Sequence, residues 1–350
     1  MMRLAEPAPA APAIRVMLGG DVMLGRLVGS AISKFGPDYP LGPIASLMRQ
    51  ADITIVNLEC AITSSRGLWH GAPKAFYFRA PPEAVGTLVG AGIDLVSLAN
   101  NHVLDYGFTG LLDTLHTLRD SGLLYAGAGP DIDEALRPAI AEAGGVRLGM
   151  AAFCDHQQDF AAQKNSPGMA WLDLDDDTAT LGAWRNALKT LRQDRVDWPV
   201  LSLHWGPNMA LRPSEKFRRL AHAAIDMGWK IVFGHSAHVF QGIEIYRGCP
   251  IIYAAGDLVD DYLVDPYFKN DHQLLIELEL AKHGLAAIEL HPVFIGRCQT
   301  GHATAGQAAN IAKRMALLCA EMESVVRQDA GQIRIDCPAA THPCNSPSEP

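Results

Sequence analysis

The sequence predicts an α/β protein with a largely parallel sheet and an active site at the carboxyl ends of its strands. Apolar runs of strand length alternate with helix-like segments, and almost every run is followed at once by a short polar cluster. In open α/β sheets, ligands bind beyond the carboxyl ends of the strands. The first three runs with their polar exits are Ile14–Leu18 before Asp21, Ile53–Val56 before Asn57 and Glu59, and Ile93–Leu98 before Asn100, Asn101 and His102.

Four later runs end in the same way. Asp, Asn and Gly after a strand are also ordinary turn and helix-cap residues, so a single exit would decide nothing. Turns do not require histidines at three separate strand ends, and His102, His204 and His238 are such histidines. The later runs are Leu148–Phe153 before Cys154, Asp155 and His156, Val200–Leu203 before His204, Ile231–Phe233 before His235, and Ile251–Ala255 before Asp257.

The segments between these runs are typical of helices, so the first half reads β-α-β-α-β, which favours parallel strands with helices on the sheet faces. Late in the chain, Gln273–Leu280 and Leu285–Phe294 are predicted to form an antiparallel pair joined around residues 283 and 284. The predicted helices are Glu83–Ala91, Phe108–Ser121, Thr180–Gln193, Glu215–Met227 and Ala308–Val326.

Length and composition predict one domain between two tails. The chain has 350 residues, of which 49% are hydrophobic and 19% are charged, and no break in composition divides it. Such a chain can bury one large core. We expect a single domain over residues 14–336, with disordered tails at 1–13, rich in Pro and Ala, and at 337–350, rich in Ser and Pro.

Charge, hydropathy and cysteine usage exclude several partners. A net charge of −9 argues against nucleic acid, whose binding needs clustered Lys and Arg. No apolar run approaches the roughly 20 residues of a membrane helix, and the first residues lack a signal-peptide pattern. The seven cysteines are odd in number and contain no CxxC, so reduced thiols are expected. These features predict a cytoplasmic protein that contacts neither membrane nor nucleic acid.

Five motifs follow one another between about Ile14 and Val293. They are Gly-Asp-Val-Met-Leu-Gly-Arg from Gly20, Asn-Leu-Glu from Asn57, Leu-Ala-Asn-Asn-His-Val-Leu-Asp-Tyr-Gly from Leu98, His-Trp-Gly from His204, and Gly-His-Ser-Ala-His-Val-Phe-Gln-Gly-Ile-Glu from Gly234. Together they resemble the CapA-like proteins, a family named for poly-γ-glutamate capsule synthesis within the calcineurin-like metallophosphatase superfamily. The resemblance implies a four-layer α/β/β/α sandwich with its site at the strand exits.

The resemblance also implies roles for particular residues. His102 falls where the superfamily keeps an acid/base imidazole, and Asp105 is placed to orient that ring. The metals would polarise the substrate and generate hydroxide from bound water. The positions where the superfamily holds two divalent metals, with Mn, Fe or Zn as the candidates here, are Asp21, Glu59, Asn101, His204 and His238.

The chain departs from the family motifs at two ligand positions. Met23 replaces the His of Asp-x-His with a soft thioether, and Ser236 replaces the first His of His-x-His. His235 lies one residue early, so in an extended segment it is expected to point to the other side of the backbone. Asp257 stands where the family typically has Asn, followed by two further Asp residues. The sequence therefore favours no metal or other cofactor.

A pocket of carboxylates and imidazoles with few metal ligands suits general acid/base chemistry. The favoured interpretation resembles the metal-independent epimerase of lasso-peptide biosynthesis, which would invert a Cα centre at or near the C-terminus of a precursor peptide. Arg26, Lys74 and Arg79 would grip the terminal carboxylate. The candidate proton carriers are Asp21, Glu59, His102, His204 and His238, and the other candidate substrate contacts are Asn101, His235, Ser236 and Asp257.

Two other functions stay open, namely a metal-dependent hydrolase of phosphoester or amide-like bonds and a role in poly-γ-glutamate capsule biosynthesis. Residue-level alternatives remain as well. Arg26 can pair with a surface carboxylate, and Lys74 and Arg79 can form the solvated face of an edge strand. Cys60 and Cys154 can carry protons, although buried cysteines are commoner.

Overall fold

The computed structural model describes residues 13–282, 284–329 and 332–337. The predicted tails lie outside the described residues, apart from Ala13, which begins β1, and Cys337. Residue 283, in the predicted turn, also lies outside them. The helices are α1 (Arg26–Phe35), α2 (Gly42–Met48), α3 (Val85–Ala91), α4 (Gly107–Asp120), α5 (Ile132–Ala135), α6 (Asp177–Gln193), α7 (Glu215–Met227) and α8 (Ala305–Ala320).

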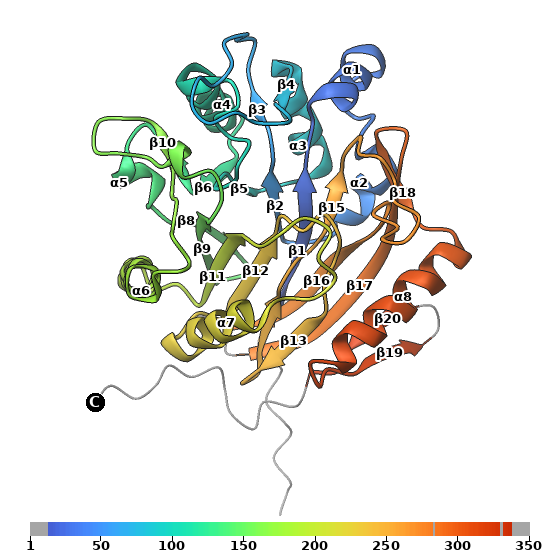
Figure 1. Ribbon diagram of the computed structural model, residues 1–350. Helices are drawn as coiled ribbons and strands as arrows, with labels where there is room; N and C mark the ends of the chain where they lie inside the picture. The colour runs from blue at the N-terminus through green and yellow to red at the C-terminus, as the bar shows by residue number, and fades with distance from the viewer. Residues whose placement is uncertain (1–12, 283, 330–331, 338–350) are drawn as a thin grey trace, which may run out of the picture.

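Two mixed sheets face each other, and helices cover their outer sides (Figure 1). The larger sheet has the order β19-β20-β17-β16-β1-β2-β5-β6, and the smaller has the order β13-β14-β12-β11-β9-β8. The strands of the larger sheet are β1 (Ala13–Val22), β2 (Ile53–Leu58), β5 (Leu95–Ser97), β6 (Leu124–Ala126), β15 (Asp257–Val259), β16 (His272–Ala281), β17 (Gly284–Gly296), β18 (Gln299–His302), β19 (Val326–Asp329) and β20 (Gln332–Ile335).

The smaller sheet comprises β8 (Ala139–Ala143), β9 (Val146–Cys154), β11 (Trp198–His204), β12 (Ile231–His235), β13 (Ile243–Tyr246) and β14 (Cys249–Ile252). One core cluster joins Val16 and Ile55 of the larger sheet to Val200 and Ile231 of the smaller. A second cluster packs α6 and α7 on the outer face of the smaller sheet. Two short ladders, β3 (Ala61–Ile62) with β4 (Arg79–Ala80) and β7 (Ala128–Gly129) with β10 (Gly168–Met169), lie outside the main sheets.

The α/β prediction is confirmed, with parallel pairing across β1, β2, β5 and β6. The predicted late pair is also confirmed, since β16 and β17 are antiparallel. The predicted helix over Ala308–Val326 is too long at its C-terminal end, because α8 stops at Ala320 and Val326 begins β19. Glu323 has a positive φ of 59°, which turns the chain between them.

Strand register assembles polar residues at the facing ends of the two sheets. In the larger sheet Asp21 is aligned with Asn57 on one side and with Asp257 on the other. In the smaller sheet His204 is aligned with His235. Aligned residues on neighbouring strands point to the same face. Among the described residues, no helix is long and apolar enough to cross a bilayer.

Candidate functional site

Asp21 lies at the centre of a buried cluster of carboxylates and imidazoles. Its Oδ1 accepts a hydrogen bond from Asn57 Nδ2 at 2.8 Å and lies 3.7 Å from His235 Nδ1. Its Oδ2 accepts from the Ser236 N–H at 3.1 Å and lies 3.5 Å from His238 Nδ1. The two carboxylate oxygens of Asp21 therefore face different sets of neighbours.

The first set contains two imidazoles in direct contact. His204 Nδ1 lies 2.8 Å from His235 Nδ1, and His204 Nε2 lies 3.0 Å from Asn101 Oδ1. His235 Nε2 lies 2.9 Å from the Ser202 hydroxyl. Ligand atoms of Asp21, His204 and His235 all lie within 4.8 Å of one another.

The second set is richer in carboxylates. His238 Nδ1 lies 2.9 Å from Asp257 Oδ1, and Tyr262 donates to Glu59 Oε2 at 3.3 Å. Ligand atoms of Asp21, Glu59, His238 and Asp257 again lie within 4.8 Å of one another. His238 of this set and the neighbouring Ser236 have positive φ angles of 59° and 96°. Non-glycine residues in this region store backbone strain, which is common at functional sites.

His102 lies at the rim of the cluster, and Asp105 fixes the orientation of its ring. His102 Nδ1 lies 2.6 Å from Asp105 Oδ2, and His102 Nε2 faces Glu59 Oε1 at 4.0 Å. The ring stacks on Phe78 at a centroid distance of 3.9 Å. His102 and His238 keep 7% and 8% of their surface exposed, whereas Asp21 and Glu59 keep 1%. Solvent and substrate therefore reach the cluster from the side where His102 and His238 lie.

Burial controls the protonation of these groups. It raises the pKa of Asp21 to about 6 and raises the pKa values of Glu59 and Asp257 well above their usual range. It lowers the pKa of His102 to about 4 and that of His235 to about 3. Low dielectric surroundings disfavour the charged form of each group. Burial therefore favours the protonated forms of Glu59 and Asp257 and the neutral forms of His102 and His235.

We expect His102 and His235 to show no protonation of their imidazole rings in a ¹³C NMR titration from pH about 7.5 to about 5.5, where an ordinary imidazole gains its proton. The unfolded chain protonates these imidazoles first, so their contribution to the free energy of unfolding falls as the pH drops below about 6.5. His102→Gln and His235→Gln assign the resonances. A midpoint near 6.5 for either would contradict the burial argument.

The structure brings together the side chains of Asp21, Glu59, Asn101, His102, His204 and His238, as the strand exits predict. It contradicts the predicted direction of His235, which faces Asp21 and His204. The alternation argument fails because His235 is the last residue of β12, in register with His204, and the backbone leaves the strand at Ser236. The Ser236 hydroxyl instead lies 3.1 Å from His156 Nε2.

Several of the predicted functional side chains already bind other groups of the protein. Lys74 Nζ pairs with Asp105 and donates to the Asn101 carbonyl, so it supports the His102 dyad. His204 is 1% exposed and both of its ring nitrogens have neighbours, which makes it a poor proton carrier. Of the predicted edge-strand segment, only Arg79 lies in a strand. Arg26 and Arg79 line a separate pocket.

The buried thiols do not carry protons readily. Burial raises the pKa of Cys60 to about 12 and raises that of Cys154 well above its usual range. Both residues are free thiols. The site residues that the candidate set missed are Asn57, which binds Asp21, and Tyr262, which binds Glu59. Asn57 stands at a recognised strand exit, but Tyr262 follows no pattern.

Residues 15–262 match the family described as bacterial capsule synthesis protein PGA_cap. The chain belongs to this family. It is 28% identical over 278 residues to the capsule biosynthesis protein CapA of Bacillus anthracis, covering 79% of this chain and 66% of that protein. It is 31% identical over 295 residues to a probable polyglutamine synthesis accessory protein of Mycobacterium tuberculosis, covering 71% of this chain and 75% of that protein.

Among solved structures, a 5'-nucleotidase from Candida albicans is similar with a TM-score of 0.44 and 11% identity, over 90% of this chain and 59% of that one. The buried Asp and His residues of this PGA_cap chain indicate an enzyme and are consistent with a metal site. The matches show the family and do not extend to the lasso-peptide epimerase branch.

Proposed function

We propose that this chain is a hydrolase that cleaves an amide-like bond in a peptide chain, with the cluster around Asp21 as a divalent-cation centre. The observation that carries the proposal is the position of Asp21, whose two oxygens face the His204–His235 pair and the His238–Asp257 pair. A carboxylate between two groups of ligand atoms suits a two-metal site. This favours hydrolysis over the metal-free epimerase that the sequence favours.

The charges of the cluster fit a cation. Asp21, Glu59 and Asp257 are buried, and among the described residues their only ion-pair partners are imidazoles. Asp257 Oδ2 and Asp260 Oδ2 are buried without a hydrogen-bond partner. Buried carboxylates are stable when a cation or a proton neutralises them. Mixed oxygen and imidazole ligands suit Mn, Fe or Zn.

The two substitutions in the family motifs leave this donor set intact. Met23 Sδ accepts from the Gly25 N–H at 3.2 Å, and the Ser236 hydroxyl lies against His156 and the Gly206 carbonyl. His235 supplies the imidazole that Ser236 lacks.

A bound divalent ion would polarise the scissile carbonyl and lower the pKa of an attacking water. The chain itself supplies the proton transfer. His102 is neutral near pH 7, because burial lowers its pKa to about 4, so its Nε2 can accept a proton and pass it to the leaving nitrogen. Asp105 holds the ring through Nδ1, and Lys74 holds Asp105.

The names of the relatives support a peptide-like substrate. One is a capsule biosynthesis protein, another a PGA biosynthesis protein, and a third a probable polyglutamine synthesis accessory protein. For this chain we infer a glutamate-rich peptide polymer as the test substrate and take phosphoesters as the competing outcome.

The deciding experiment incubates the chelator-treated protein with a γ-linked glutamate oligomer, with and without Mn, Fe or Zn. We expect shortened chains by mass spectrometry only when metal is returned, and about one or two ions per chain by elemental analysis. The Asp21→Asn variant should neither shorten the chains nor bind the ions. Cleavage that is indifferent to chelator, or cleavage of phosphoesters alone, would overturn the proposal.

A peptide epimerase is the second candidate, because Glu59 and His102 are adjacent and differ in protonation. Burial raises the pKa of Glu59, so it keeps a proton, and lowers that of His102, so it can take one. In an epimerase His102 would remove the Cα proton on one face and Glu59 would return a proton on the other, which requires the substrate to separate the two groups beyond their present 4.0 Å. In deuterium oxide an epimerase would add one deuterium at a single Cα of a precursor peptide and leave every bond intact.

A further inference from the structure

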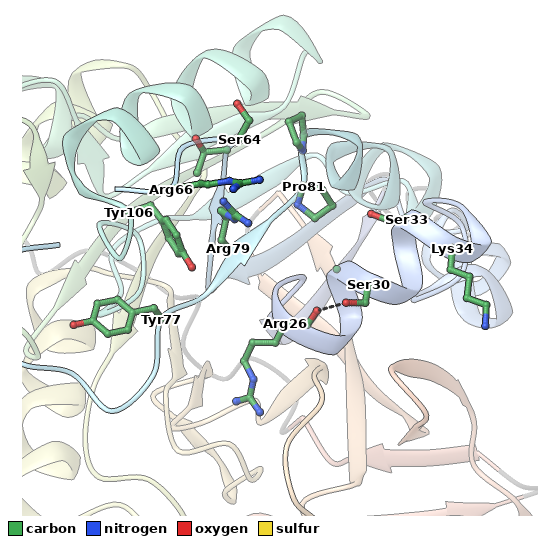
Figure 2. Close-up of a pocket in the computed structure, with 13 residues that line it drawn as sticks. Arg26, Ser30, Ser33, Lys34, Ser64, Arg66, Tyr77, Arg79, Pro81 and Tyr106 are labelled. Atoms are coloured by element: carbon green, nitrogen blue, oxygen red, sulfur yellow. Dashed lines mark hydrogen bonds between the residues drawn. The ribbon is translucent and has the colours of Figure 1, made fainter. Parts of the chain in front are cut away.

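A cavity of about 720 Å³ lies between α1 and the segment that follows β3, and its charged lining is entirely cationic. Arg26 and Lys34 extend from α1, Arg66 lies after β3, and Arg79 begins β4 (Figure 2). Among the described residues, no Asp or Glu lines this cavity, although the whole chain carries a net charge of −9. A cationic pocket on an acidic protein favours a negatively charged ligand.

Two of the guanidinium groups are not neutralised by the protein. Arg66 has no ion-pair partner within the part of the chain that the structure describes, and Arg79 donates to the Ser65 carbonyl at 2.7 Å while lying over the Tyr106 ring. Arg26 is partly neutralised, since its Nε lies 3.4 Å from Asp261. Arg66 and Arg79 are therefore free to make charge-assisted hydrogen bonds with a ligand.

The cations are spread over separate walls. Arg26 and Lys34 stand at the two ends of α1, and Arg66 and Arg79 belong to the wall across from it (Figure 2). Tyr77, Tyr106 and Pro81 also line the pocket. A single small dianion would be bound by cations that converge on one point, whereas this spread suits several carboxylates along one chain.

The pocket adjoins the buried cluster without being part of it. Tyr77 and Arg79 line the pocket, while the ring of Phe78 between them stacks on His102. Alternate residues of an extended segment point to opposite sides, so the segment 77–79 separates the pocket from the reacting groups. A ligand in the pocket would hold a part of the substrate that is remote from the reacting bond.

We propose that this pocket binds the free carboxylates of the peptide substrate through Arg66 and Arg79, with Arg26 and Lys34 at its ends. The inference rests on the proposed function for the identity of the substrate. The binding itself does not require the reacting cluster. An experiment can therefore distinguish failure of the proposed reaction from failure of the proposed binding.

The test is fluorescence anisotropy with a fluorescein-labelled, γ-linked octaglutamate and the full chain at low salt. We expect Arg66→Gln/Arg79→Gln to weaken binding by about 10-fold or more, because both replacements remove charged donors. Arg185→Gln, an exposed position on α6, removes one positive charge elsewhere and should leave the affinity unchanged. Labelled octaglutamine should not bind, and added salt should weaken octaglutamate binding.

Three results would overturn the proposal. They are equal affinities for the double variant and Arg185→Gln, equally tight binding of octaglutamine, and displacement of the peptide by inorganic tripolyphosphate at lower concentration than by free octaglutamate. Thermal melting of each variant verifies that it is folded. Glu59→Gln should bind octaglutamate normally and lose cleavage, whereas a wild-type protein that binds octaglutamate without cleaving it would contradict only the reaction and not the pocket.

Discussion

His102→Ala is expected to lower the turnover number for peptide cleavage by about 10²–10⁴-fold, the usual effect of removing a general acid/base. Among the imidazoles of the described cluster, only His102 is partly exposed and also paired with a carboxylate that a lysine binds. The carboxylate is Asp105 and the lysine is Lys74. The measurement is the rate of chain shortening at saturating substrate and metal. His116→Ala on α4, where the imidazole is 73% exposed, is the matched control.

Asp105→Asn should have a smaller effect than His102→Ala, and the difference tests how the dyad works. The amide keeps the shape of the carboxylate but can no longer hold Nδ1–H and the Lys74 ammonium together. The Phe78 N–H, which donates to Asp105 Oδ2 at 2.6 Å, also loses a charged acceptor. Full turnover in both His102→Ala and Asp105→Asn would place the proton transfer on other residues.

The sequence predicts those parts of the fold and site that depend on local periodicity. The runs at Ile14, Ile53 and Val200 become β1, β2 and β11, and the helix over Glu215–Met227 becomes α7 at the same bounds. The strand runs are mostly apolar and are followed by polar residues, and the helix combines apolar and polar residues at helical spacing. Because parallel strands end at the same edge of a sheet, the positions of Asp21 and Glu59 along the chain predict that they lie close together. His204 ends a strand of the other sheet and reaches Glu59 because the two sheets face each other.

Features that depend on contacts between distant segments could not be predicted. The direction of His235 follows from its register with His204 across two strands, which no local alternation reveals. Lys74 reaches Asp105 from 31 residues away, and Tyr262 reaches Glu59 from 203 residues away. Arg66 lies in a loop without periodicity, so the cationic pocket appears only when β4 and α1 are brought together.

Gly20→Ala is expected to destabilise the protein by about 3 kcal/mol or more, because overpacking against rigid backbone is among the costliest single changes. A Cβ at this position would lie 1.9 Å from the Gly256 carbonyl oxygen, which also accepts from the Asp21 N–H at 2.9 Å. Relieving the clash requires β1 and β15 to separate. That movement would carry Asp21 away from Asp257, its aligned neighbour.

The measurement is the free energy of unfolding by urea for Gly20→Ala beside Gly182→Ala. A Cβ at Gly182, inside α6, would have no heavy atom within 4 Å, so this control should be neutral or stabilising by up to about 1 kcal/mol through helix propensity. Gly20→Ala should also bind less metal than the wild type, since its effect reaches Asp21 directly. Equal stabilities for the two variants would show that β1 and β15 do not approach as closely as the Gly20 contact requires.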